Sequence, residues 1–315
     1  MKQLKALLLT EGMHGMISQV EGLAKALNAE YNHKIIKFRF PWNLIPPKFT
    51  PISEVILKDK IYLDGNEIPD LVISCGRKSV IPSIVLKKKN PELFTIHIKD
   101  PKVIFKNFDV IIAPEHDHLN GNNVYSSKGA IHYITDIEID NAKNYLKDKI
   151  NSQKIVSLIL GGPNKYYNFD KDHLIEIFNK IKAIFIANNY KVIVVPSMRT
   201  PKSSIELAIN ELGKYGYIVN SIDRQAYLSA LALANNVIVT CDSISMISEA
   251  ATSGKPIYIA HMKAKRNNYR FKRFFKLFKE MGIIRDLDDK AESWTYKKIN
   301  EAERIANIIS TKIKN

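Results

Sequence analysis

The chain has 315 residues, 45% of them hydrophobic, and carries a formal net charge of +15. This length accommodates two domains that each bury a core, and the positive charge favours phosphorylated substrates or an anionic membrane surface as partners. No apolar run reaches the roughly 20 residues of a membrane-spanning helix, and Cys75 and Cys241 lack the spacing of a metal site, so we expect neither an integral membrane protein nor a metal centre.

An apolar run over residues 4–10 opens the chain. It is too short for a secretory signal and no small-residue cleavage site follows it, so we predict a first strand and a cytoplasmic location, with peripheral attachment at the inner membrane left open. A turn with Gly12, His14 and Gly15 comes next, and helical spacing predicts a helix over 17–27. The glycines either admit a ligand close to the backbone or simply form a tight turn.

The next part of the chain alternates strands with polar turns. Strands are predicted over residues 33–40, 70–74, 93–98 and 109–113. Between the first two, residues 41–51 contain Trp42 and several prolines and are predicted to be irregular. We expect this loop to pack on its own domain, and dipping into a membrane surface is the alternative.

Ionisable side chains follow the strand predicted over residues 109–113. His116, between Glu115 and Asp117, suits a proton acceptor near neutral pH. A loop of exposed charges that binds nothing is the alternative. We predict no metal here, because adjacent side chains seldom converge on one ion.

A polar stretch over residues 135–152 is predicted to join two domains, which would span 1–145 and 146–315. Both halves alternate apolar strands with helices, which is typical of parallel sheets. The amphipathic helix predicted over 298–313 ends the chain and is free to cross back to the first domain.

Two polar turns follow predicted strands in the second half. Gly161-Gly162 follows the strand over residues 154–160, and the sequence PSMRTP follows the strand over 191–195. The second turn combines a planar cation with two hydroxyls, a set suited to a diphosphate. The residues that supply these groups are Ser197, Arg199 and Thr200.

Residues 235–260 form the strongest candidate site. A buried strand leads through Asp242 and Ser243 into a helix predicted over 244–252. This turn gathers free N–H donors and the positive end of the helix dipole, which suits a phosphate; a helix cap that binds nothing is the alternative. Glu249, inside the helix, is placed to accept hydrogen bonds from sugar hydroxyls, or else is an ordinary solvated residue.

A basic and aromatic stretch over residues 266–279 follows. Its aromatic side chains are spaced to pack on the sheet from one face of a helix, which leaves the cations solvated. Docking on an anionic membrane or on nucleic acid is the alternative. Nucleic acid is the less favoured of these two, because no recognition motif accompanies the charge.

Six motifs occur in order along most of the chain, after the first glycine turn with Gln19. They are SCGRKSVIPS (74–83), IKDP (98–101), APEHDHL (113–119), LGGPNKYYNFD (160–170), PSMRTP (196–201) and VTCDSISMISEAATSGKPIYI (239–259). Together they resemble the mitochondrial fission, or elongated mitochondria, family, which looks like a divergent branch of the GT-B glycosyltransferases. The resemblance implies an α/β protein with two Rossmann-like domains facing across a cleft.

The resemblance also implies roles for particular residues. In GT-B proteins the C-terminal domain holds a nucleotide-sugar and the N-terminal domain presents the acceptor. Carried over, the nucleotide-sugar would contact Gly161, Gly162, Asn164, Ser197, Arg199, Thr200, Asp242, Ser243, Ser245, Met246 and Glu249. The catalytic base would be found among His14, Glu115, His116 and Asp117.

These observations lead to one main hypothesis. The protein transfers a sugar from a nucleotide-sugar donor to an envelope lipid or saccharide acceptor, and it uses neither a metal nor a bound cofactor. The alternative is a non-catalytic adaptor that keeps the GT-B fold and lies peripherally on a membrane.

Overall fold

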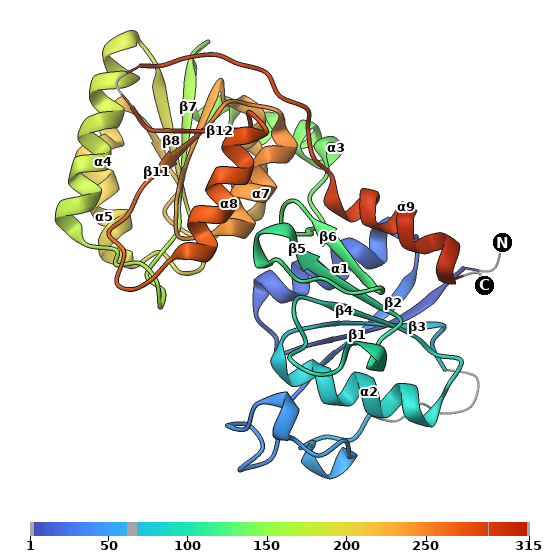
Figure 1. The fold of residues 1–315 in the computed structure, drawn as a ribbon. Helices are drawn as coiled ribbons and strands as arrows, with labels where there is room; N and C mark the ends of the chain where they lie inside the picture. The colour runs from blue at the N-terminus through green and yellow to red at the C-terminus, as the bar shows by residue number, and fades with distance from the viewer. Residues whose placement is uncertain (1–2, 62–67, 289, 314–315) are drawn as a thin grey trace. The chain divides into compact units, whose positions relative to one another are not determined.

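The computed structural model describes residues 3–61, 68–288 and 290–313, and the chain divides into two compact units (Figure 1). Unit 1 comprises residues 1–133 and 300–315, and unit 2 comprises residues 134–299. In the described part of the chain, no helix is both long enough and apolar enough to cross a membrane.

Unit 1 is built on a six-stranded parallel sheet. The strands lie in the order β2 (Glu30–Ile35), β1 (Lys5–Thr10), β3 (Leu71–Cys75), β4 (Phe94–Ile98), β5 (Val110–Pro114) and β6 (Val124–Ser127). Helices flank this sheet on both faces, and they are α1 (His14–Ala26), α2 (Val80–Lys89) and α9 (Glu301–Ile313). Every strand runs in the same direction, so all their carboxyl ends lie at one edge.

Side chains along each strand of unit 1 point alternately to the two faces of the sheet, which explains the two core layers of the unit. Leu8 and Ile73 belong to the apolar cluster under α1 and α9, whereas Leu9 and Val72 belong to the cluster under α2. Successive side chains of a strand point to opposite faces, so a strand covered on both sides must be apolar throughout. β3, which is buried at every residue, shows this pattern.

One predicted strand in unit 1 has the wrong bounds. The strand expected over 33–40 is β2, which ends at Ile35. Phe38 instead forms an isolated antiparallel bridge with Leu57, so the chain leaves the parallel sheet before it reaches the prolines of residues 41–51. Proline lacks the N–H that a sheet interior requires, which explains why the strand does not continue.

Unit 2 repeats the architecture. Its parallel strands lie in the order β12 (Ile284–Asp286), β11 (Ile257–Ala260), β10 (Asn236–Thr240), β7 (Ile155–Leu160), β8 (Lys191–Pro196) and β9 (Gly216–Ile218). Its helices are α3 (Asp136–Asn141), α4 (Lys171–Ile184), α5 (Lys202–Leu212), α6 (Arg224–Leu233), α7 (Ile244–Ala250) and α8 (Tyr269–Glu280). The central strands β7 and β10 are buried at every residue.

The segment that follows residue 133 packs within unit 2. Helix α3 contacts α6, and the Leu146 N–H donates a hydrogen bond to the Ser229 hydroxyl at 3.0 Å. The domain boundary expected at residue 145 falls within this segment. Thr135 caps α3 by accepting a hydrogen bond from the Glu138 N–H, and the Glu138 side chain accepts one from the Thr135 N–H in return.

Helix α8 carries the basic and aromatic stretch. Its four phenylalanines (Phe271, Phe274, Phe275 and Phe278) are all buried, and the rings of Phe274 and Phe278 lie 4.2 Å apart between centroids. The lysines of the helix are exposed. The predicted packing is therefore confirmed for the phenylalanines, and Tyr269 at the start of the helix is 65% exposed.

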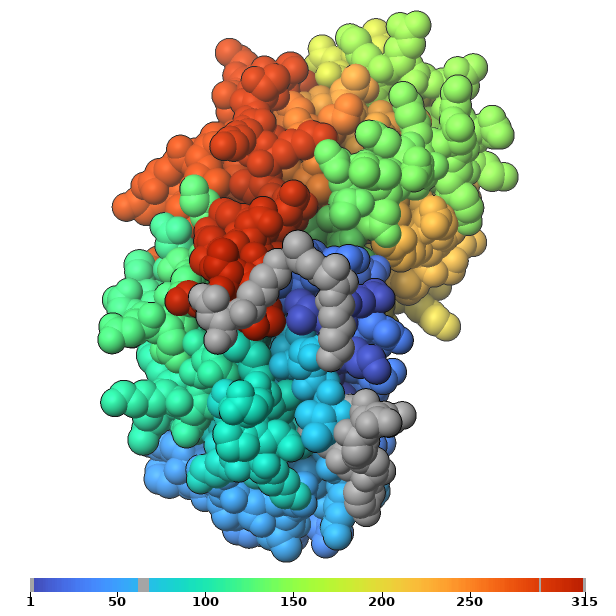
Figure 2. All heavy atoms as spheres, turned by 90° about the vertical axis from the view of Figure 1, so that its right-hand side faces the viewer, coloured from blue at the N-terminus to red at the C-terminus, as the bar shows by residue number. Residues whose placement is uncertain are grey.

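The last helix returns to unit 1. Helix α9 packs against α1 and contributes Ile305 and Ile309 to the apolar cluster there, both fully buried. Figure 2 shows the other side of α9, in red, at the surface. Ile308, one residue before Ile309, is 36% exposed. Because helical residues three and four apart share a face, one side of α9 closes the core while the other faces solvent.

We expect Ile305→Ala to lower the free energy of unfolding of unit 1 by about 3 kcal/mol, because it removes three buried carbons and leaves a cavity. Ile308→Ala, the matched control on the exposed side, should cost less than about 1 kcal/mol. Urea unfolding of both variants, followed by circular dichroism, measures the difference. Equal losses would mean that α9 does not pack on unit 1 by the face described.

Candidate functional site

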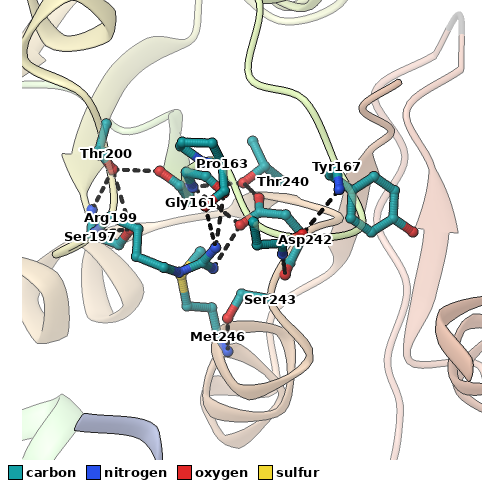
Figure 3. Close-up of polar contacts among 12 residues, drawn as sticks. Gly161, Pro163, Tyr167, Ser197, Arg199, Thr200, Thr240, Asp242, Ser243 and Met246 are labelled. Carbon is teal, nitrogen blue, oxygen red and sulfur yellow. Dashed lines mark hydrogen bonds and ion pairs between the residues drawn. The ribbon is translucent and has the colours of Figure 1, made fainter. Parts of the chain in front are cut away.

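The candidate site lies at the carboxyl edge of the sheet in unit 2. Strands β10, β7 and β8 are neighbours, so the turns that follow Thr240, Leu160 and Pro196 lie side by side (Figure 3). In open α/β sheets, ligands bind outside the carboxyl ends of the strands. The sheet order thereby brings together three turns that lie far apart in sequence.

A buried carboxylate holds these turns together. The Asp242 side chain has no solvent exposure. Its carboxylate accepts hydrogen bonds from the Gly162 N–H at 3.1 Å, the Thr240 hydroxyl at 2.7 Å and Arg199 Nη2 at 2.7 Å. The Thr240 Oγ1 in turn accepts from the Gly161 N–H at 2.8 Å. Three donors, one of them charged, offset the cost of burying this carboxylate.

Arg199 reaches across from the turn after β8 to this carboxylate, as Figure 3 shows. Besides the ion pair, its Nη1 donates to the Gly162 carbonyl oxygen at 2.8 Å. The side chain is 39% exposed, so part of it faces solvent. A guanidinium has five N–H donors. Arg199 therefore keeps donors for an anion while part of its charge is compensated by Asp242.

Gly161 and Gly162 are required because the other two turns pack closely against them. A Cβ on Gly161 would overlap the Asp242 carboxylate, and a Cβ on Gly162 would overlap the backbone carbonyl of Arg199. Only residues without a Cβ allow the first turn to lie against the other two. The glycines therefore do more than form a tight turn within their own loop, because they set the packing of all three turns.

Hydroxyls of the turn after β8 tie it to the turn after β7. The Thr200 hydroxyl lies 2.6 Å from the Gly161 carbonyl oxygen and 2.8 Å from that of Leu160, and it accepts from the Ser197 N–H at 2.8 Å. The Ser197 hydroxyl lies 3.2 Å from Thr200 Oγ1. Thr200 is thus engaged in holding the turn, whereas Ser197 retains capacity for a further hydrogen bond.

Asn164 shapes the loop that leaves β7. Its Nδ2 donates to the Asp242 carbonyl oxygen at 2.9 Å, and its Oδ1 accepts from the backbone N–H groups of Tyr166 and Tyr167. The side chain closes a turn of the backbone, as asparagine commonly does. Asn164 therefore positions the loop.

Helix α7 begins at the third turn, and Ser243 caps it. The Ser243 Oγ accepts a hydrogen bond from the Met246 N–H at 3.4 Å, and the helix runs from Ile244 to Ala250 before a short turn of 3-10 helix. Ser243 and Ser245 are half-buried, and Met246 is buried. Of the two cap candidates in the sequence, Ser243 makes the cap and Asp242 serves the three turns instead.

Glu249 lies inside this helix and is only 8% exposed. Burial raises the pKa of its carboxyl to about 7, partly offset by a hydrogen bond from Tyr227 and the charge of Arg224. The Tyr227 hydroxyl donates to Oε2 at 3.1 Å. The interpretation of Glu249 as a solvated residue is therefore wrong. Near neutral pH this carboxyl exists in both protonation states, so it can donate as well as accept a hydrogen bond.

Tyr227 is a residue of the candidate site that the sequence did not indicate. It lies on α6, before the strand that leads to Asp242, in the apolar stretch RQAYLSALAL. Helical spacing shows that Tyr227 can lie on one face of a helix, but no local signal says which carboxylate its hydroxyl will meet. The contact depends on how α6 and α7 pack on the same sheet.

The expected catalytic residues follow two strands of unit 1. His14 is exposed at the start of α1, and its Nε2 lies 3.3 Å from the Tyr133 hydroxyl. In the turn after β5, His116 is buried, Asp117 is half-buried and Glu115 is exposed. Strands β3 and β4 separate β1 from β5, which places the two turns about 14 Å apart by normal strand spacing. The structure does not bring His14 and the 115–117 cluster into one hydrogen-bonded group.

Solved structures share this fold. A UDP-GlcNAc 2-epimerase of Neisseria meningitidis, bound to UDP-GlcNAc, matches with a TM-score of 0.54 at 12% identity, over 99% of this chain and 100% of that one. The S. aureus MnaA-UDP co-structure matches with a TM-score of 0.53 at 15% identity, over 98% and 89%. At such low identity these matches show the fold, and they confirm two Rossmann-like domains of the GT-B class.

Comparison of sequences identifies the family. The family model for mitochondrial fission ELM1 matches residues 14–313. The uncharacterized protein RP120 of Rickettsia prowazekii is 28% identical, with 95% of this chain and 94% of that protein covered. The mitochondrial fission protein ELM1 of Arabidopsis thaliana is 25% identical over 76% of this chain, which spans 63% of the plant protein. The chain belongs to the mitochondrial fission ELM1 family.

Proposed function

We propose that unit 2 binds a nucleotide-activated sugar and that the protein transfers the sugar to an acceptor hydroxyl without a metal. One observation carries this proposal: three polar turns meet around Arg199 and Asp242 at the carboxyl edge of a parallel sheet, with the buried Glu249 on the helix that begins there. The Neisseria epimerase of similar fold is bound to UDP-GlcNAc and the S. aureus MnaA structure holds UDP, which supports the ligand class.

The diphosphate would lie against the exposed part of Arg199. Fixed donors that point at the position of developing charge lower the barrier to departure of a leaving group. Arg199 is held in place by Asp242 and the Gly162 carbonyl oxygen, so it would not have to reorganise when the sugar leaves. The hydroxyls of Ser197 and Ser243 are further candidates for contacts with phosphate oxygens.

Glu249 would bind hydroxyls of the ribose or the sugar. Its carboxyl is shielded from bulk solvent and is oriented by Tyr227, so a hydrogen bond to it competes little with water. With a pKa of about 7 it is ionised in part at neutral pH and more fully at pH 8. Ligand affinity should follow this ionisation if Glu249 acts as an acceptor.

The acceptor in this proposal is an envelope lipid or saccharide, and its hydroxyl needs a base. His14, Glu115 and Asp117 are the candidates, because their side chains are exposed or partly exposed, whereas the ring of His116 is closed from solvent. A positioned imidazole or carboxylate can take a proton from a hydroxyl as the sugar is transferred. Replacing each candidate in turn and measuring kcat identifies the base.

Calorimetric titration with UDP-sugars and GDP-sugars tests the donor site. We expect wild-type protein to bind at least one of them and Glu249→Ala to weaken that binding by tenfold or more, since about 1.4 kcal/mol corresponds to tenfold. Glu206→Ala, which removes an exposed carboxylate from α5, is the control and should bind as wild type does. If wild-type protein binds no nucleotide or nucleotide-sugar, the donor site does not exist.

A second candidate function is the non-catalytic adaptor. The observation that favours it is the ion pair of Arg199 with Asp242, which already occupies the strongest cation of the expected diphosphate site. The two candidates differ in product formation. Incubation with a nucleotide-sugar and an acceptor should release free nucleotide and yield glycosylated acceptor only if the protein is a transferase, whereas conversion of the sugar without an acceptor would indicate an epimerase.

A further inference from the structure

A loop of unit 1 stands apart from the two sheets. After β2 the chain forms a loop that is closed at its base by the antiparallel bridge between Phe38 and Leu57, and we call residues 37–58 the neck-closed loop (Figure 1, blue, near α2). Two backbone hydrogen bonds close the neck: Arg39 N–H to the Ile56 carbonyl at 2.8 Å, and Lys58 N–H to the Lys37 carbonyl at 2.9 Å.

The neck-closed loop is internally ordered. The Thr50 hydroxyl donates to the Pro46 carbonyl oxygen at 3.0 Å, and Arg77 Nη1 donates to the Ile45 carbonyl oxygen at 3.2 Å. Ile56 and Leu57 are buried in the core layer under α2. The loop is thus fastened to the unit at its base and braced within, so its outer side chains are displayed on a fixed backbone.

Its outer side chains are unusually apolar. Five large hydrophobic residues are exposed within sixteen positions: Phe40 (80%), Leu44 (70%), Phe49 (67%), Ile52 (43%) and Val55 (61%). Outside this region, no window of that length in the described chain exposes more than two. Single exposed apolar residues are ordinary, but a concentration of them indicates a surface that another body covers.

The charge around these side chains is positive. Residues 37–58 carry four cations (Lys37, Arg39, Lys48 and Lys58) and one carboxylate, which gives a net charge of +3. That carboxylate, Glu54, is paired with Lys89 at 2.7 Å, and Lys48 Nζ lies 4.5 Å from the ring centroid of Phe49. Apolar side chains interspersed with lysine and arginine are suited to a bilayer interface. There the apolar side chains enter the boundary between headgroups and acyl chains, and the cations contact lipid phosphates.

We propose that the neck-closed loop docks the protein on an anionic lipid surface. Phe40, Leu44 and Phe49 enter the boundary between headgroups and acyl chains, and the cations of the loop contact the phosphates. A second copy of the chain is a poorer occupant, because a symmetric contact through this loop would bring two surfaces of charge +3 together. This docking needs no nucleotide-sugar, so it stands or falls separately from the proposed function.

The proposal assigns docking to the loop and not to α8. Helix α8 has many exposed cations, but its four phenylalanines are buried in the core of unit 2. Its one large exposed aromatic side chain is Tyr269. Such a helix is attracted to a membrane mainly by charge, and that attraction is screened by salt. Docking through the neck-closed loop should therefore persist at a salt concentration that removes purely electrostatic binding.

Flotation with vesicles of phosphatidylcholine and phosphatidylglycerol tests the proposal. We expect the wild-type chain to float with these vesicles and the Phe40→Ser/Phe49→Ser variant to lose at least tenfold in partitioning. Ile137→Ser/Ile222→Ser is the matched control, because it removes two exposed hydrophobic residues of unit 2 (69% and 58% exposed) and should float as wild type does. Equal flotation of wild type and the loop variant overturns the proposal.

Two more measurements distinguish docking through the loop from docking through α8 and from self-association. Lys37→Gln/Lys48→Gln should weaken flotation more than Lys272→Gln/Lys276→Gln on α8; the reverse order would assign docking to α8. In a Trp294→Phe background, Trp42 is the only tryptophan left, and brominated lipid should quench its fluorescence. If the loop variant instead changes the sedimentation of the lipid-free protein, a second copy occupies the loop and the proposal is wrong.

Discussion

Replacing Gly162 with alanine is expected to destabilise unit 2 by about 3 kcal/mol and to abolish nucleotide binding. The new Cβ would overlap both the carbonyl carbon and the carbonyl oxygen of Arg199. Backbone atoms cannot rotate away as the end of a flexible side chain can, so the turns after β7 and β8 must separate. Separation would break the bonds from Gly162 and Arg199 to the buried Asp242 carboxylate.

The matched control is Gly213→Ala, at the end of α5. A Cβ there meets only Ile209 Cγ2, at 3.9 Å, and the φ angle of −58° suits alanine. This control should be neutral or more stable than wild type by about 0.5 kcal/mol, because alanine restricts the unfolded chain. Urea unfolding of both variants measures the effect. A Gly162→Ala variant as stable as wild type would contradict the packing of the three turns.

The second large effect is a dependence of stability on pH that Glu249 causes. The pKa of its carboxyl is about 7 in the folded protein against a reference value of 4.5. Below pH 4.5 the group is protonated in both states, and above that value the unfolded chain loses its proton first. The contribution of Glu249 to the free energy of unfolding is therefore fully present below pH 4.5. It falls by about 3 kcal/mol in total as the pH rises through 7.

The Glu249→Gln variant isolates this effect, because glutamine is neutral at every pH and can still accept from Tyr227. Relative to wild type, its free energy of unfolding should rise between pH 4.5 and 8. Tyr227→Phe should shift the upper end of this window to higher pH, since it removes a hydrogen bond that favours the ionised carboxyl. The exposed Glu206→Gln should follow wild type within about 0.5 kcal/mol. Parallel curves for wild type and Glu249→Gln would show that Glu249 is not buried as described.

The two effects bear on function in different ways. Gly162 acts through the backbone, so its replacement removes the proposed ligand site together with the stability of the turns. Glu249 is different, because it is a buried carboxyl whose raised pKa costs stability near neutral pH. Groups of this kind are frequent at functional sites, which is why Glu249 is the more informative residue for the proposed donor site.

Much of the fold was predictable from local patterns. Continuous apolar runs gave the buried strands, and the phenylalanine spacing of α8 gave its buried face, because periods of 2.0 and 3.6 residues are local properties of the backbone. The polar turns after residues 160, 196 and 240 were likewise visible. The six ordered motifs pointed to the family, and the family model and the GT-B class of fold agree with that resemblance.

The loop after β2 was less predictable. The sequence placed prolines and Trp42 in an irregular segment, but the strand was expected to run to residue 40. Whether an apolar side chain in such a loop is buried depends on how the loop packs against the neighbouring helix. In the structure the loop is closed by the bridge between Phe38 and Leu57, and Phe40 beyond it is 80% exposed.

Local sequence patterns located most strands, turns and helix starts, because these depend on contacts within a few positions; the end of β2 is an exception. The tertiary structure alone decided that Arg199 pairs with Asp242, 43 residues further along the chain, that Tyr227 meets Glu249, and that α9 returns to unit 1. The physical reason is the strand order β10-β7-β8, which makes neighbours of turns far apart in sequence. Burial of a charged side chain follows from that order and not from its own neighbours in the chain.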